Sequence, residues 1–76
     1  MLRTKLNRRA FEIAITKRNI SQNHAAQKIG VSKTHLSQLV TGKKSPSPAT
    51  RQRILDYFQG STFDDFFVIE VSDDDE

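Results

Sequence analysis

Five polar side chains recur at intervals that place them on one side of a helix: Lys33, Thr34, Ser37, Gln38 and Thr41. At 100° per residue, positions three or four residues apart share a helical face. This face is uncharged in its middle and carries both hydrogen-bond donors and acceptors. Such groups suit the edges of base pairs in the major groove of DNA. The alternative interpretation is an ordinary solvated helix surface.

The chain offers little for catalysis or metal binding. Serine and histidine are present, but no acid–base pair stands at a spacing that supports catalysis. His24 and His35 cannot close a structural metal site by themselves, and the chain has no cysteine. The glycines are isolated, so they do not form a loop that cradles phosphate. We therefore expect a protein that is not an enzyme, with no catalytic residue, metal or cofactor.

Charge is distributed unevenly along the chain. Residues 1–60 contain all 12 Lys and Arg and, as their only acidic residues, Glu12 and Asp56, whereas residues 61–76 are acidic with no basic residue. A basic region of this kind indicates a polyanionic partner, most commonly nucleic acid, or else a solvated surface beside an acidic tail. No stretch is apolar enough for a membrane helix or a signal peptide. The simplest expectation is a cytoplasmic protein with no membrane partner.

Five helices are expected, and each has a capping residue in front of it. Asn, Ser and Thr are favoured N-caps because their side-chain oxygens accept hydrogen bonds from N–H groups of the first turn. Gly30 and Gly42 end the second and third helices because glycine adopts the left-handed conformation without strain. The predicted helices are 8–18 after Asn7, 22–29 after Ser21, 33–41 after Ser32, 48–58 after Ser47 and 63–67 after Thr62.

The two ends of the chain are predicted to be less regular. The first few residues are expected to fray. Residues 67–71 favour β-structure and are expected to extend, either as a strand that pairs across a dimer axis or as an irregular tail. The acidic residues from 72 onwards are expected to be disordered because like charges repel. Ile13, opposite the apolar face of its helix, is expected to contact part of the segment after the fourth helix, which contains Phe63, Phe66, Phe67, Val68, Ile69 and Val71.

Residues 22–42 combine these helix signals into one motif, QNHAAQKIGVSKTHLSQLVTG. Ala26 is small enough for two helices to cross closely. Gly30 permits a tight turn, and Val31 fills the corner from inside. Leu36 anchors the following helix to the core and leaves its polar face free.

This motif resembles the helix-turn-helix of the Cro and phage-repressor type, also called lambda-repressor-like or XRE. The resemblance extends over about residues 6–67 and implies an all-α fold. It implies a compact four- to five-helix lambda-repressor-like domain over residues 1–67, with the motif at 22–42 and a short acidic extension at 68–76. It also implies that the second helix of the motif docks in the major groove.

By position in the motif, the resemblance implies two kinds of DNA contact. Base edges would be contacted by Lys33, Thr34, Ser37 and Gln38. The sugar–phosphate backbone would be contacted by residues at both helix starts and near the end of the second helix: Gln22, Asn23, Ser32, Thr41, Lys43, Lys44 and Ser45. A palindromic operator needs two motifs related by a two-fold axis, so a homodimer is implied. We expect it to be weak because few residues are available for an interface.

Two departures from the family pattern concern packing. The family usually has Leu where this chain has Ala25. It also often has a buried Arg–Glu pair where this chain has Ile15 and Val40. Because both positions are apolar together, we expect these two side chains to make the same contact without charge.

The leading hypothesis is a sequence-specific transcriptional regulator, a repressor that occupies a double-stranded DNA operator and excludes polymerase. By resemblance, the setting is a phage, plasmid or other mobile element in a bacterial or phage-infected cell. Regulation would come from concentration, a regulatory protein partner or the tail. The alternative is a small protein-interaction module of antitoxin or anti-repressor type, which the lack of aromatic residues or methionine on the 33–41 face disfavours.

Overall fold

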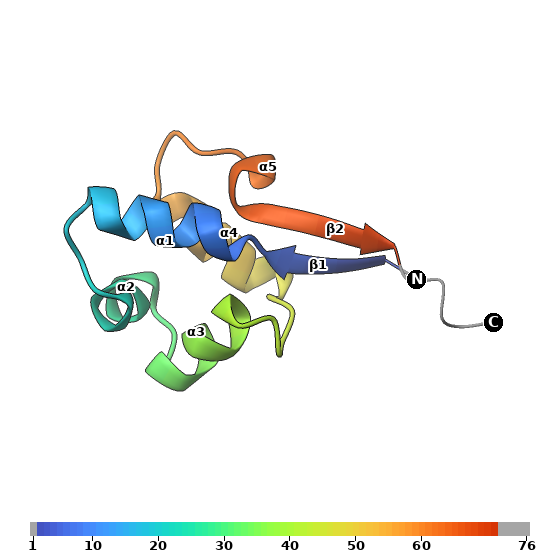
Figure 1. The fold of residues 1–76 in the computed structure, drawn as a ribbon, viewed down its shortest axis with the longest axis horizontal. Helices are drawn as coiled ribbons and strands as arrows, with labels where there is room; N and C mark the ends of the chain where they lie inside the picture. The colour runs from blue at the N-terminus through green and yellow to red at the C-terminus, as the bar shows by residue number, and fades with distance from the viewer. Residues whose placement is uncertain (1, 72–76) are drawn as a thin grey trace.

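The computed structural model describes residues 2–71 of the chain. Within this range, five helices pack into a small bundle, and two strands form a ribbon that projects from one end of it (Figure 1). The elements are β1 (Leu2–Leu6), α1 (Arg8–Lys17), α2 (Gln22–Ile29), α3 (Lys33–Val40), α4 (Pro48–Tyr57), α5 (Phe63–Phe66) and β2 (Phe67–Val71). No helix of the described range is long and apolar enough to cross a membrane. The disorder predicted from residue 72 concerns residues outside that range.

The helices begin where the capping residues predicted. Each of four N-cap side chains accepts a hydrogen bond from an N–H group three residues later, at 3.0–3.2 Å; they are Asn7, Ser21, Ser32 and Ser47. The prediction for α2 is confirmed at both ends. The other helices end one residue earlier than predicted, because the last residue of each predicted range is the C-cap.

The core lies between the helices and is closed by α5. Its largest fully buried side chains are Phe11, Leu36, Leu39, Ile54 and Phe58. The Phe58 ring stacks on Phe66 with centroids 4.8 Å apart and meets Phe11 edge-on at 5.9 Å. Phe66 is therefore a core residue, and Phe63 packs against the core while partly buried.

The two positions of the expected uncharged contact are both in this core. Ile15 on α1 is 8% exposed and Val40 on α3 is 5% exposed. Ala25 is fully buried beside the crossing of α2 with its neighbours. A charged side chain at either of the first two positions would be buried, whereas direct contact between them stays a prediction.

The β-ribbon corrects two predictions about the chain ends. Residues 2–6 do not fray: β1 pairs antiparallel with β2, in a register that runs from Leu2↔Val71 to Leu6↔Phe67. Residues 67–71 are therefore not an irregular tail. They form a strand whose partner is β1 of the same chain rather than a strand across a dimer axis. The base of the ribbon is fixed because Leu6 and Phe67 are buried in the core. The predicted boundary between residues 67 and 68 lies inside β2.

Ile13 is only about half-covered. It remains 46% exposed on α1, in a shallow depression lined by residues of the same helix. The expected contact with the segment after α4 stays a prediction: α1 lies against α5 within that segment, whereas β2 pairs with β1.

Candidate nucleic-acid interface

The turn between α2 and α3 is held from two sides. Gly30 has φ 95°, and the N–H groups of Gly30 and Val31 both donate to the carbonyl oxygen of Ala26 at 2.9 and 3.0 Å. From α4, the Arg53 guanidinium donates to the carbonyl oxygen of Gly30 at 3.0 Å. A Cβ atom at Gly30 would lie 3.3 Å from that guanidinium. The angle between α2 and α3 is therefore fixed by backbone geometry and by a contact from outside the motif.

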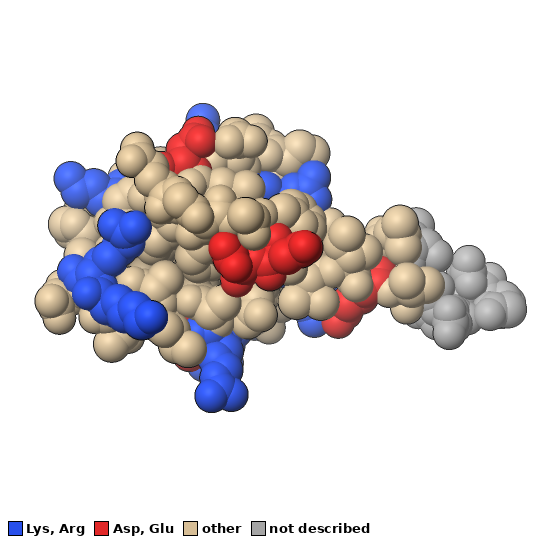
Figure 2. All heavy atoms as spheres, turned by 90° about the horizontal axis from the view of Figure 1, so that it is seen from above, with Lys and Arg blue, Asp and Glu red and all other residues tan. Residues whose placement is uncertain are grey.

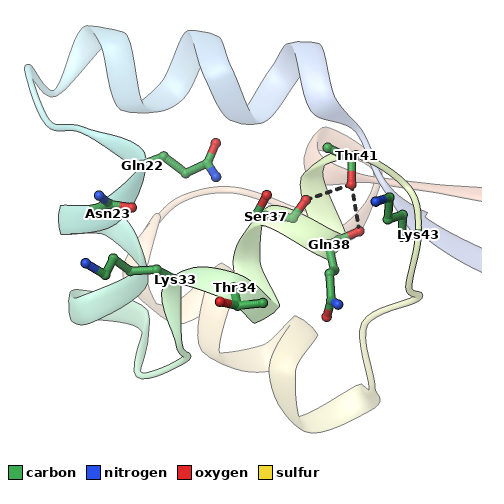
Figure 3. Close-up of a pocket in the computed structure, with 8 residues that line it drawn as sticks. All are labelled: Gln22, Asn23, Lys33, Thr34, Ser37, Gln38, Thr41 and Lys43. Carbon is green, nitrogen blue, oxygen red and sulfur yellow. Dashed lines mark hydrogen bonds between the residues drawn. The ribbon is translucent and has the colours of Figure 1, made fainter.

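A shallow groove of about 470 Å³ follows α3 on the side away from the core. Eight side chains from α2, α3 and the next loop line it (Figure 3): Gln22, Asn23, Lys33, Thr34, Ser37, Gln38, Thr41 and Lys43. All eight were predicted from the sequence, and the structure brings them together on one surface. Gln22 and Gln38 are half-buried, and the other six are exposed.

Three predicted residues lie outside the lining of this groove. Ser32 lines the adjoining depression between α2 and the start of α3, together with Asn23 and Lys33. Lys44 and Ser45 are exposed in the loop after α3. The N–H groups of Lys43 and Lys44 both donate to the carbonyl oxygen of Gln38, at 2.9 and 3.2 Å, so the loop begins tightly against the helix end.

The side chains along the groove differ in how far their hydrogen-bonding capacity is already used. The Thr41 hydroxyl donates to the carbonyl oxygen of Ser37 at 2.8 Å, so its hydrogen is engaged within its own helix (Figure 3). Within residues 2–71, the side-chain polar atoms of Thr34, Ser37 and Gln38 form no hydrogen bond. These three side chains are available to a ligand, whereas Thr41 acts first as a helix cap.

Acidic side chains are absent from the groove segment and gather elsewhere on the described surface. The segment 21–47, which contains α2, α3 and the following loop, has four lysines and no acidic residue. Figure 2 shows the face that carries α5, where acidic side chains gather in the middle. Asp64 and Asp65 occupy the first turn of that helix. The groove therefore presents positive charge and neutral polar groups to an anion.

The structure adds two basic residues that sequence reasoning missed. Arg3 of β1 donates through Nε to Ser45 Oγ at 2.9 Å and through its guanidinium to the Gly42 carbonyl oxygen at 3.2 Å. Lys5 lies beside Gly42 and forms an ion pair with Glu70 at 3.6 Å. The alternation of LRTKL, with apolar residues or threonine at every second position, was the available signal for a strand.

Comparison with known proteins agrees with this geometry. A model of the family described as helix-turn-helix matches residues 12–66, which is more than half of the chain. The matched range contains α2, the turn, α3 and every residue that lines the groove. No curated protein and no solved structure gives a significant match to the chain.

Proposed function

We propose that this chain, which belongs to the Cro and phage-repressor type (XRE) family of helix-turn-helix proteins, is a sequence-specific repressor. The family makes it a DNA-binding regulator, and in the proposal α3 reads the major groove. It occupies its operator and excludes polymerase. The observation that carries this proposal is the set of unengaged polar side chains on the exposed face of α3, inside a groove surrounded by lysines.

The chemistry of α3 suits base recognition. An α-helix about 10–12 Å wide fits the major groove, which is about 12 Å wide. The Gln38 amide has the donor and acceptor needed to pair with adenine, and Lys33 suits the acceptors of guanine. Thr34 and Ser37 supply hydroxyls that accept or donate. We therefore assign these four residues to base edges.

The flanking residues suit the sugar–phosphate backbone. Gln22 and Asn23 stand at the first turn of α2, and Ser32 caps α3, so their polar groups meet a phosphate near helix N-termini. Lys43, Lys44 and Ser45 follow α3 and supply charge and a hydroxyl. Thr41 contacts DNA only as an acceptor, because its hydrogen is engaged with Ser37.

One chain supplies one motif, whereas a repressor of this size gains affinity and specificity by binding two half-sites. We therefore propose a palindromic operator and a weak homodimer, with half-sites about one turn of DNA apart, or about 34 Å. The setting is the cytoplasm of a bacterium, on DNA of phage or plasmid type. A protein-interaction module has no support from the α3 face, which carries no aromatic or methionine side chain.

Selection of binding sites from random duplex DNA by the purified full chain tests this function. The expected result is one enriched motif, made of two inverted half-sites about 10 base pairs apart. Repeating the selection with Gln38→Ala gives an internal check, because base preference is expected to relax at one position in each half-site. Recovery of unrelated sequences by the wild-type chain would contradict sequence-specific reading.

A further inference from the structure

The β-ribbon has an apolar face that continues beyond the core. Strand alternation and the register place Leu2, Leu6, Phe67, Ile69 and Val71 on one face. The two residues at the base are buried. The three toward the tip are exposed, at 69% for Leu2, 54% for Ile69 and 69% for Val71. The core thus extends along the ribbon as an uncovered apolar strip.

The two faces of the ribbon differ in charge. Thr4 is the remaining member of the apolar face, so the ribbon itself contributes no ionisable side chain to it. One cation reaches the face from α4, where the Arg51 guanidinium donates to Thr4 Oγ1 at 2.9 Å. The other face carries Arg3, Lys5, Val68 and Glu70. Leu2 and Val71 lie beyond Thr4 toward the tip, so two copies can meet there without an ionisable side chain of the ribbon entering the contact. An isolated two-stranded ribbon is also only marginally stable in water, so its tip gains from being covered.

The position of the ribbon suits a two-fold axis on DNA. The ribbon lies along the long direction of the molecule and projects past the helices (Figure 1). A strand of five residues spans about 17 Å. Half-sites one DNA turn apart place each recognition helix about 17 Å from the axis, which is half of about 34 Å. The end of α3 lies beside the ribbon through the Arg3–Gly42 contact, so an axis at the ribbon tip lies within about one strand length of it.

We propose that this apolar ribbon face, formed at its exposed end by Leu2, Ile69 and Val71, packs against the same face of a second copy of the chain and forms the dimer contact. This proposal takes the two-fold spacing from the proposed function. The exposed apolar surface is observed independently of that function. The contact is small, below about 1,200 Å², so the dimer is transient in solution and is completed on DNA.

Sedimentation of the full chain over a concentration series, without DNA, tests the contact. Ile69→Glu is expected to weaken self-association at least tenfold, because it places a charge in the strip. Val68→Glu is the matched control: it makes the same kind of change on the other face of the same strand, opposite Lys5 in the register. It is expected to dimerise as the wild type does. Thermal unfolding of both variants checks that the ribbon has formed, and Val71→Glu repeats the test at the tip.

The outcomes separate this proposal from the proposed function. Dimerisation of Ile69→Glu at wild-type strength would overturn the ribbon contact, and so would loss of the dimer in Ile13→Glu alone. A wild-type chain that is monomeric in solution and binds the two half-sites independently would overturn it as well. Binding to a single isolated half-site measures the function of α3, and only its absence in the wild-type chain counts against sequence-specific DNA binding.

A second inference comes independently from the two hydrogen bonds of Arg3. They join β1 to both ends of the segment Gly42–Ser45, which carries the predicted backbone contacts Lys43 and Lys44. We infer that Arg3 is a positioning residue, which holds this loop in the conformation that meets phosphate. This inference also rests on the proposed function, because it assigns the loop to DNA.

Replacing Arg3 while keeping its charge tests the positioning role. Lysine lacks the planar fork that makes two directed bonds, so Arg3→Lys is expected to lose about three- to tenfold in affinity on all sequences, with an unchanged salt slope. In the Arg3→Lys background, Ser45→Ala is expected to cost less than in the wild-type chain, because part of its effect is loss of the same Arg3–Ser45 contact. Arg8→Lys, on α1 and paired with Glu12, is the control and should bind as the wild type does. Wild-type affinity for Arg3→Lys would overturn the inference.

Discussion

The helix-turn-helix and the β-ribbon are held in place in opposite ways. The turn between α2 and α3 sits on a continuous core and is also clamped by Arg53 from α4. The ribbon is buried only at its base, and its tip is exposed on both strands. The surface proposed to read bases is therefore tied to the core and to α4, whereas the surface proposed to join two copies is exposed beyond its base. Four predictions test this contrast, from the largest expected effect to the smallest.

The largest effect is expected from a charge in the core beneath the motif. Ile15→Arg buries an unpaired guanidinium and should lower the free energy of unfolding by about 3–5 kcal/mol. Adding Val40→Glu should recover part of this loss if the two side chains are in contact. The same substitution on the ribbon, Ile69→Arg, should change stability by about 0.5 kcal/mol or less. Urea unfolding of dilute protein measures all three, and equal losses at both positions would remove the contrast.

Base preference is expected to reside in α3 alone. Gln38→Ala should cost about 1–3 kcal/mol on the selected site and relax preference at one base pair. Lys43→Ala should weaken all sequences alike and flatten the salt slope by about one unit. Lys5→Ala on the ribbon should leave base preference unchanged. Anisotropy titrations with single-base variants of the site measure these effects, and an unchanged profile for Gln38→Ala would remove the assignment of the recognition face.

The rigidity of the turn can be separated into two contributions. Gly30→Ala is expected to lower the free energy of unfolding by about 1–2 kcal/mol, from strain at φ 95° and from displacement of Arg53. Gly60→Ala has a similar φ of 89° but meets nothing within 4 Å, so it reports the strain alone. Thermal or urea unfolding compares the pair. A cost at Gly30 no greater than at Gly60 would mean that the Arg53 contact contributes little.

The smallest effect is expected on the ribbon. Glu70→Gln removes the ion pair with Lys5, whose charged groups are 3.6 Å apart on partly exposed side chains. Such a surface pair contributes about 0–1 kcal/mol, so unfolding should change by about 0.5 kcal/mol or less. The loss should shrink further in high salt because exposed charges are screened. A larger loss would show that the ribbon is held by more than its base.

The features predicted from the sequence are those set by neighbours in the chain. Ser21 and Ser32 cap helices through N–H groups only three residues away, so their roles could be inferred without the fold. The polar face of α3 could be inferred as well, because helical spacing alone puts Thr34, Ser37 and Gln38 on one side of the helix. The helix limits were therefore accurate to about one residue, and the side chains expected on one face of residues 33–41 do line one groove.

The features that were missed depend on partners far away in the chain. Leu2 pairs with Val71, and no local signal connects the two. Arg3 appeared as part of a fraying end because its acceptors, near residue 45, meet it only after β1 has paired with β2. Arg53 reaches Gly30 only through the angle at which α4 crosses α2. These contacts follow from tertiary packing, which spacing and capping do not encode.

The pairing of β1 with β2 also sets the order in which the domain is completed during synthesis. β1 is the first described element to leave the ribosome and β2 is the last, so β1 must wait until all five described helices have been made. Closing so long a loop carries an entropic cost that the contacts within residues 22–42 do not have. The helix-turn-helix can therefore form on a nascent chain before the ribbon closes. Closure of the ribbon is the final step in completing the domain. A dimer built on the ribbon would admit only finished chains.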